Sequence, residues 1–277
     1  MLKADKELIV LPVVSLLATI AVAVTFLMPL LDSCTTGTAG ASASCDLATT
    51  DYILLGLMYV ALAFITIFFN AALVYAANQR MSGGDPTVGS AIRGALLRVH
   101  RILPWALVSA TVSLILRAIE ERAGLLGRIV AAIGGVAWAL VTFLVIPVLV
   151  IEDIGVGAAV KRSGAMFKRT WGENMAAQIG FGLLGFLLVL PGIAVTVFGF
   201  SVGGTTAVIL VVIGVAWILL VSMVLAALNG IFQTALYRYA SGNPTPAFPD
   251  AMMAAAFAPK RGGRGRGNPM MPRGIAG

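Results

Sequence analysis

The 277-residue chain is 59% hydrophobic and only 11% charged, whereas a soluble domain holds about 25% charged residues. Most of its surface therefore cannot face water, which excludes an ordinary soluble globular domain. The net charge is +7, and its effect depends on where the basic residues stand along the chain.

Uncharged apolar runs mark the predicted membrane spans. They cover residues 8–31, 52–79, 102–116, 129–151 and 175–237. A helix needs about 20 apolar residues to cross roughly 30 Å of hydrocarbon, and the last run is long enough for two helices with a turn near 199–206. We therefore predict six transmembrane helices. A barrel would instead show alternating strands of about ten residues with one polar face, and these runs are apolar on all sides.

The basic residues favour one orientation of these spans. With the amino terminus in the cytoplasm, the basic residues of segments 3–6, 80–101, 161–169 and 238–273 all fall on the cytoplasmic side. Only the short loop 117–128 holds arginines on the outside, together with two glutamates. The positive-inside rule thus predicts a multi-pass protein of the cell membrane with both termini in the cytoplasm.

The loop 32–51 is the longest predicted external segment, and it contains both cysteines, Cys34 and Cys45. Two cysteines outside the membrane are compatible with a disulfide that closes a small loop, and we expect this bond. The alternative is two free thiols in a flexible loop rich in Ser, Thr and Gly. No histidine accompanies the pair, so a metal site is not expected here.

A short amphipathic helix is predicted after the second span. Two glycines at 83–84 end the preceding helix, Asp85 stands where a side chain can cap the next helix, and Pro86 suits its first position. One face is apolar from residue 88 to residue 103, and the basic residues lie elsewhere. A helix this short and charged is expected to lie in the membrane interface.

The same pattern returns 68 residues later, where residues 85–93 align with residues 153–161 and Arg101 aligns with Arg169. A repeat at fixed spacing indicates one architecture used twice. Asp153 is therefore expected to cap a second interfacial helix, whose apolar face enters the membrane. That face comprises Val156, Val160, Phe167 and Trp171.

A third, weaker copy is predicted after the sixth span, ahead of the apolar run 251–258. The predicted fold is thus all-α: a polytopic membrane domain over residues 1–258, with six transmembrane helices and two or three cytoplasmic interfacial amphipathic helices. The internal repeat falls near 85–116 and 153–184.

The basic faces of the interfacial helices are expected to contact anionic lipid headgroups. The predicted contacts are Arg93, Arg98, Arg101, Lys161, Arg162, Lys168 and Arg169. The tail 259–277 is rich in Gly, Pro and Arg and is predicted to be disordered. It reads either as an RGG-like nucleic-acid tail or as a basic segment on anionic lipid; without interleaved aromatic residues we expect lipid and no nucleic acid.

Candidate catalytic patterns are weak. The run 180–185 matches G-x-G-x-x-G, but this fingerprint binds dinucleotides only between a strand and a helix, so here we expect close helix packing. His100 lacks an acidic or cysteine partner nearby. Glu152 and Asp153 are a carboxylate pair that can perform acid–base chemistry, but a cap at Asp153 and a Glu152 charge near the helix start explain them better. We expect no catalytic residue, no cofactor and no metal.

Neutral amides stand inside the predicted spans: Asn70, Asn174, Gln178, Asn229 and Gln233. We expect them to hydrogen-bond helix to helix. The sequence favours a non-enzymatic lipid-interacting or scaffolding module, acting with a membrane-protein partner or as a homo-oligomer. The alternative is a transporter or channel-like protein without buried charges. An amide-lined cavity with a helix break at Pro191 supports the alternative, and a tightly packed bundle supports the module.

A further pattern follows the fourth span. Its residues are Pro147, Val150, Glu152, Asp153, Gly155, Arg162, Ser163, Trp171, Gly172 and Glu173. It resembles an uncharacterised family of prokaryotic six-span membrane proteins, and also the membrane domain fused to some glycerophosphodiester phosphodiesterases. The resemblance implies a six-span domain over residues 1 to about 258. It does not carry over the enzymatic activity, because no long soluble stretch and no matching set of His and acidic residues is present.

The predicted orientation has a direct test. In a chain whose own cysteines are replaced by serine, Ser241→Cys should react with a membrane-impermeant thiol reagent only after the cells are permeabilised. The native loop cysteines, after reduction, should react in intact cells. Labelling of Ser241→Cys in intact cells would contradict the orientation.

Overall fold

The computed structural model describes residues 7–35, 48–122, 124–169 and 171–243, with the backbone alone described at 7–9, 32–35, 169, 171–179 and 181. Every element in these residues is helical. The helices are α1 (Glu7–Thr35), α2 (Thr49–Met81), α3 (Val88–Leu97), α4 (Val99–Arg122), α5 (Gly124–Thr142), α6 (Val145–Ile151), α7 (Val156–Arg169), α8 (Trp171–Val202) and α9 (Gly204–Ala240).

Six helical segments are long and apolar enough to cross a membrane, which confirms the predicted fold class. They are Val10–Leu31, Thr49–Met81, Val99–Arg122, Gly124–Ile151, Gly182–Val202 and Gly204–Ala240. The third segment begins three residues earlier than predicted, because α4 starts at Val99, directly after α3.

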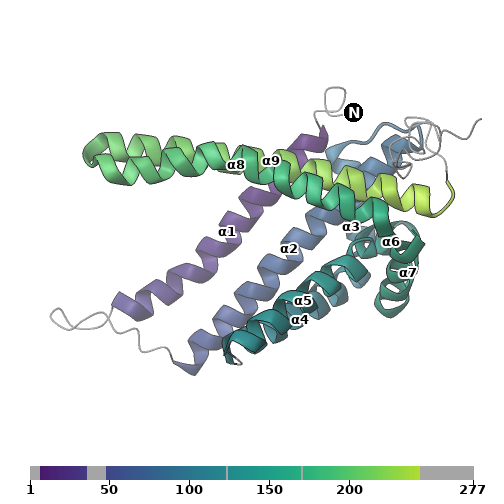
Figure 1. Cartoon of the computed structure of the whole chain (residues 1–277), viewed down its shortest axis with the longest axis horizontal. Coiled ribbons are helices and arrows are strands. Elements are labelled where there is room, and N and C mark those ends of the chain that lie inside the picture. Colours follow the sequence, from purple (N-terminus) through teal and green to yellow (C-terminus); the bar gives the residue numbers. More distant parts are fainter. Residues whose placement is uncertain (1–6, 36–47, 123, 170, 244–277) are drawn as a thin grey trace, which may run out of the picture.

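The helices splay from one end of the molecule (Figure 1). The α8–α9 hairpin runs across the view at an angle to α1, α2, α4 and α5. We call the end where α2 and α9 finish and α3, α6 and α7 lie the packed end. The turns from α4 to α5 and from α8 to α9 lie far from the packed end and apart from each other (Figure 1).

Nearly all buried side chains lie at the packed end. One cluster joins the alanines of α2 to α3, α4, α6 and α9, around Ala72, Ala91 and Ile102. A second cluster joins α4, α6, α7 and α9, around Trp105, Val148 and Leu236. Small residues allow this closeness: a Cβ added at Gly94 of α3 would come within 2.5 Å of the Tyr75 ring of α2.

Away from the packed end, the spans expose large apolar side chains. Leu126, Phe198 and Val212 each expose more than 60% of their surface. Exposing apolar area to water costs about 25 cal/mol per Å², whereas lipid tails solvate it. This distribution is what a chain embedded in a bilayer requires.

The starts of α3 and α7, at Val88 and Val156, stand 68 residues apart, the spacing of the predicted repeat. The surroundings of these helices differ from the prediction. In α7, Ala159 and Phe167 are buried, and Val156 and Val160 pack against the second cluster. The apolar face thus covers the protein core rather than entering lipid, because α5 and α6 lie against it. The third copy falls in residues outside the described part of the chain.

Both predicted helix caps are wrong. The cap of α3 is Thr87, whose hydroxyl accepts a hydrogen bond from the Ser90 N–H at 3.0 Å. Pro86 does not enter the helix, so Asp85 lies too far from the first turn and pairs with Arg80 at 3.0 Å instead. α7 begins at Val156, with the Gly155 carbonyl accepting from the Ala159 N–H.

The carboxylate of Asp153 forms ion pairs with Arg98 and Arg101 instead. Its predicted role as the cap of α7 fails because two residues separate it from the first helical residue.

The α8–α9 hairpin is held by close contact between small residues. A Cβ at Gly214 would lie 2.7 Å from the Gly192 carbonyl oxygen and 2.8 Å from the Thr196 nitrogen. Pro191 does not break α8, which runs unbroken to Val202. The Trp217 indole donates to the Leu188 carbonyl at 2.9 Å. This bond lies near Pro191, which has no backbone N–H to donate within the helix.

Gly214→Ala should therefore destabilise the protein by about 1–3 kcal/mol, the usual cost of overpacking, because the added Cβ would meet the Thr196 hydroxyl as well as these two backbone atoms, which cannot move aside. Gly56→Ala is the matched control: nothing lies within 4 Å of its added Cβ, and alanine gains up to about 1 kcal/mol of helix propensity. Unfolding by a denaturing detergent measures both. Equal stability of the two variants would show that the hairpin contact is unimportant.

Candidate functional site

The site begins with the break between α5 and α6. Pro147 lacks an N–H and crowds the carbonyl four residues before it, which favours a break in the helix at this point. α5 ends at Thr142 and α6 begins at Val145. The buried hydroxyl of Ser163, on α7, donates to the Val141 carbonyl at 2.5 Å and accepts from the Leu144 N–H at 3.2 Å. One side chain thus satisfies two backbone groups beside the break.

The turn after α6 carries the strongest electrostatic contacts. Asp153 has a φ of 54°, in the left-handed region that few residues other than Gly, Asn and Asp adopt. Its carboxylate lies 2.7 Å from Arg98 Nη1 and 2.7 Å from Arg101 Nε. Arg98 also donates from Nε to the Val150 carbonyl at 3.2 Å. The turn between α6 and α7 is thereby fixed to the junction of α3 and α4.

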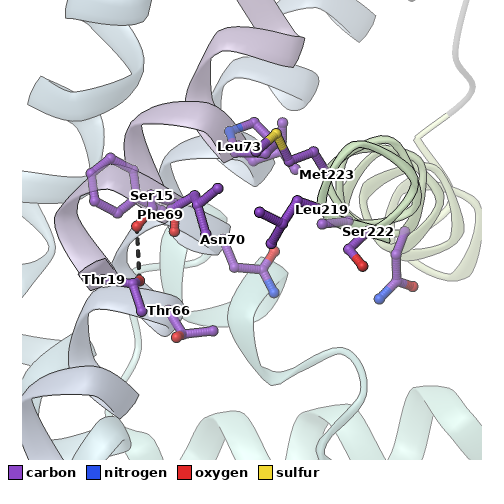
Figure 2. A pocket seen from close by; sticks show the side chains of 13 residues that line it. Ser15, Thr19, Thr66, Phe69, Asn70, Leu73, Leu219, Ser222 and Met223 are labelled. Carbon is purple, nitrogen blue, oxygen red and sulfur yellow. Dashed lines mark hydrogen bonds between the residues drawn. The ribbon is translucent and has the colours of Figure 1, made fainter. Parts of the chain in front are cut away.

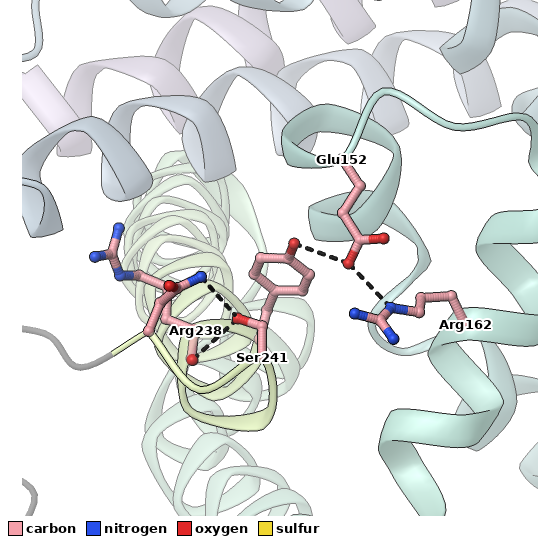
Figure 3. Close-up of polar contacts among 6 residues, drawn as sticks. Glu152, Arg162, Arg238 and Ser241 are labelled. Atoms are coloured by element: carbon pink, nitrogen blue, oxygen red, sulfur yellow. Dashed lines mark hydrogen bonds and ion pairs between the residues drawn. The ribbon is translucent and has the colours of Figure 1, made fainter.

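Glu152 ties the same turn to α9. Its Oε1 accepts from the Tyr237 hydroxyl at 3.0 Å and from Arg162 Nε at 3.1 Å (Figure 3). Arg162 lies on α7, so this carboxylate joins three elements. Glu152 is therefore a structural contact between helices rather than a charge near the start of α7.

Hydrogen bonds from Arg238 join the end of α9 to the end of α2. Arg238 Nη1 donates to Asn78 Oδ1 at 3.0 Å and to Ser82 Oγ at 2.7 Å. Figure 3 shows Arg238 and Ser241 at the end of α9, beside the Glu152 contacts. The last turns of α2 and α9 are thus held together by a hydrogen-bonded cation.

The predicted headgroup contacts divide into two groups. Arg98, Arg101 and Arg162 have carboxylate partners within the chain, which the prediction did not foresee. Arg93 on α3 and Lys161 and Lys168 on α7 are exposed and make no ion pair among the described residues. We call these three the basic surface. The side chain of Arg169 lies outside the described part.

A cavity of about 280 Å³ lies between α1, α2 and α9. Figure 2 shows its polar side chains, and the lining includes Ser15, Thr19, Thr66, Asn70, Ser222 and Asn229. The Thr19 hydroxyl donates to the Ser15 carbonyl and the Thr66 hydroxyl to the Leu62 carbonyl. The rest of the wall is apolar, so the cavity is an uncharged polar pocket among spans.

A second cavity, of about 410 Å³, lies between α5, α8 and α9. Its lining includes Phe143, Asn229, Phe232 and Gln233. Gln233 is 7% exposed, and its Oε1 accepts no hydrogen bond from the described residues. Within the described part of the chain, the expected helix-to-helix bonds are therefore not found for Asn70, Asn229 or Gln233. The side chains of Asn174 and Gln178 lie outside the described part.

The other residues singled out in the sequence are the glycines of 180–185, His100 and the two cysteines. In the run 180–185, a Cβ at Gly185 would meet Leu225 of α9 at 3.0 Å, whereas Gly180 and Gly182 have open space. Close packing thus holds for one of the three glycines. His100 is exposed, and among the described residues no group of acidic, His or Cys side chains could hold a metal. The predicted bond between Cys34 and Cys45 lies outside the described side chains.

The model of a family of unknown function, DUF6159, matches residues 49–246. The chain belongs to this family. The DUF6159 match runs from α2 to just beyond α9, so it contains the ion pairs and interhelical hydrogen bonds of the packed end, while α1, whose Leu11 joins the first buried cluster, lies outside it. The predicted resemblance began at residue 1, and the matched part is therefore shorter than expected. Comparisons with curated proteins and with solved structures gave no match.

Sequence reasoning missed the partners on α9 and α2 in this DUF6159 chain. Tyr237 and Arg238 follow the last long apolar run, and Asn78 and Ser82 flank the end of the second. Their contacts join residues more than 80 positions apart. Polar residues at both ends of apolar runs are a signal that interhelical contacts form there, but the signal does not give the pairs.

The Asp153 ion pairs should matter more than the exposed pair of Asp85 with Arg80. Asp153→Asn keeps the left-handed turn but removes the charge, and we expect a loss of about 1–2 kcal/mol. This is below the roughly 3–5 kcal/mol for a fully buried pair, because water screens these half-exposed side chains. Asp85→Asn, whose carboxylate is 89% exposed, should change stability by about 0.5 kcal/mol or less.

Denaturing-detergent titration of both variants at low and high salt tests this prediction. The effect of Asp153→Asn should shrink at high salt. If the two variants lose equal stability, the turn after α6 does not depend on its ion pairs.

Proposed function

We propose that this multi-span membrane protein is a non-enzymatic module that binds anionic lipid at its packed end. The supporting observation is how the charges are distributed there. The described carboxylates of the packed end, Asp85, Glu152 and Asp153, each have an arginine partner within the chain. The cations of the basic surface are exposed, and they have no carboxylate partner in the part of the chain that the structure describes.

The physical reason is electrostatic attraction to the leaflet. Each Lys or Arg near an anionic surface contributes about 1 kcal/mol, and the attraction falls off within a Debye length of about 8–10 Å. α3 and α7 place the basic surface at the ends of the spans, where headgroups lie. α7 is held by its packing on α5 and α6, so lipid does not need to hold the helix in place.

The proposal places the packed end and both termini in the cytoplasm of a cell, as the distribution of basic residues favours. The resemblance to glycerophosphodiester phosphodiesterases concerns their membrane domain only, and the proposal takes no activity from it. No catalytic residue, cofactor or nucleic-acid partner is part of the proposal.

A transporter or channel-like role is the second candidate. It is favoured by the cavity between α1, α2 and α9, whose wall contains the amides of Asn70 and Asn229. The continuous α8 argues against it, since Pro191 does not form the discontinuous helix that many carriers use at their binding sites. Lipid binding therefore remains the first proposal.

Replacing Arg93, Lys161 and Lys168 together with Gln tests the proposal. Binding of phosphatidylglycerol, titrated by native mass spectrometry, should weaken by about fivefold per removed charge at low salt. Replacing Arg117, Arg122 and Arg128 with Gln removes the same charge from the loop that also holds Glu120 and Glu121, and should weaken this binding much less. Unaltered binding in the first variant, or equal losses in both, would refute the proposed surface.

A further inference from the structure

We propose that Gln233 anchors a ligand site within the membrane. The cavity between α5, α8 and α9 binds the polar group of an uncharged amphiphile, such as a lipid with a free hydroxyl. That group donates a hydrogen bond to Gln233 Oε1. The inference does not rest on the basic surface, which lies on other helices and recognises charge.

The first observation is the unpaired acceptor. Gln233 is more than nine-tenths buried, and its Oε1 has no hydrogen-bond partner among the described residues. Buried polar groups in native proteins are almost always hydrogen-bonded, and inside a bilayer no bulk water is at hand to replace a missing partner. An amide oxygen can only accept, so the missing partner is a donor.

The second observation is the cavity that this side chain lines. Its volume of about 410 Å³ far exceeds the roughly 15 Å³ that one water molecule needs. Phe143 and Phe232 form part of the wall, with ring centroids 6.4 Å apart. Asn229 adds one further polar side chain, and no charged residue lines the cavity. Such a wall suits an apolar body with a small neutral polar group.

The distance of Gln233 from the end of α9 indicates how deep in the membrane the polar group of the ligand lies. Gln233 stands seven residues before the end of α9 at Ala240, which corresponds to about 10 Å at 1.5 Å per residue. The polar group would thus lie just below the headgroup region of the leaflet at the packed end. On the α8 side, Gly182 leaves open space, and the neighbouring Leu183 and Leu184 expose apolar surface along which a chain can extend.

Two ligands that differ in one donor test this inference. The purified full-length chain is titrated with 1-oleoylglycerol, which has free hydroxyls, and with methyl oleate, which has the same acyl chain and no donor. Native mass spectrometry measures binding. We expect 1-oleoylglycerol to bind about three- to tenfold more tightly, the value of one neutral hydrogen bond. Equal affinities, or no binding of either, would mean that the cavity holds only water or loosely packed lipid, and the proposal would be wrong.

Variants assign the preference to Gln233. Gln233→Leu keeps the size of the side chain but removes the acceptor, so the preference for 1-oleoylglycerol should vanish. Without ligand its melting temperature should not fall, because an unsatisfied oxygen is removed. Thr234→Val is the matched control: this buried hydroxyl bonds to the Gly230 carbonyl of its own helix, and the preference should remain. A preference that survives in Gln233→Leu would overturn the assignment.

The two-ligand comparison needs no variant, so it decides the proposal even if Gln233→Leu does not fold. The variant that lacks the basic surface separates this inference from the proposed function. It should lose phosphatidylglycerol binding while keeping the preference for 1-oleoylglycerol.

Discussion

The arrangement of the helices depends on one turn, the residues between α6 and α7. Asp153 holds a left-handed backbone there, and its carboxylate meets two arginines from the junction of α3 and α4. Glu152, next to it, reaches α7 and α9. In a bilayer, apolar surface gives helices little reason to associate, because lipid tails are as apolar as leucine. Polar contacts at the end of the spans, together with close packing of small residues, therefore fix how the helices meet.

The break in the fourth span makes this turn available. Pro147 lies at the interruption of the helix, and Ser163 bonds to two backbone groups beside it. The short α6 then packs in the core between α2, α4, α7 and α9. Without the break, the acidic pair would emerge on a different side of the fourth span. The proline, the serine and the two carboxylates thus act as one structural unit.

The spans and the repeat could be predicted because apolar runs and basic segments are local signals along the chain. The first residues of α3 and α7 were harder to predict. The sequence predicts Asp85 as the cap of α3, but the nearby Thr87 and Ser90 form the cap. The pairing of Asp153 with Arg98 and Arg101 was not predictable from one sequence, since nothing in spacing shows which helices meet. The same holds for the cavities, which arise where splayed helices leave space around amides that were expected to pair.

The two cavities lie on different sides of α9, separated by this one helix. Asn229 and Ala226 line the cavity on its α1–α2 side and also the cavity on its α5–α8 side. A molecule that turns the Asn229 amide toward one compartment withdraws it from the other. Thermodynamic linkage then requires that any influence of an occupant of one cavity on binding in the other be returned with equal strength.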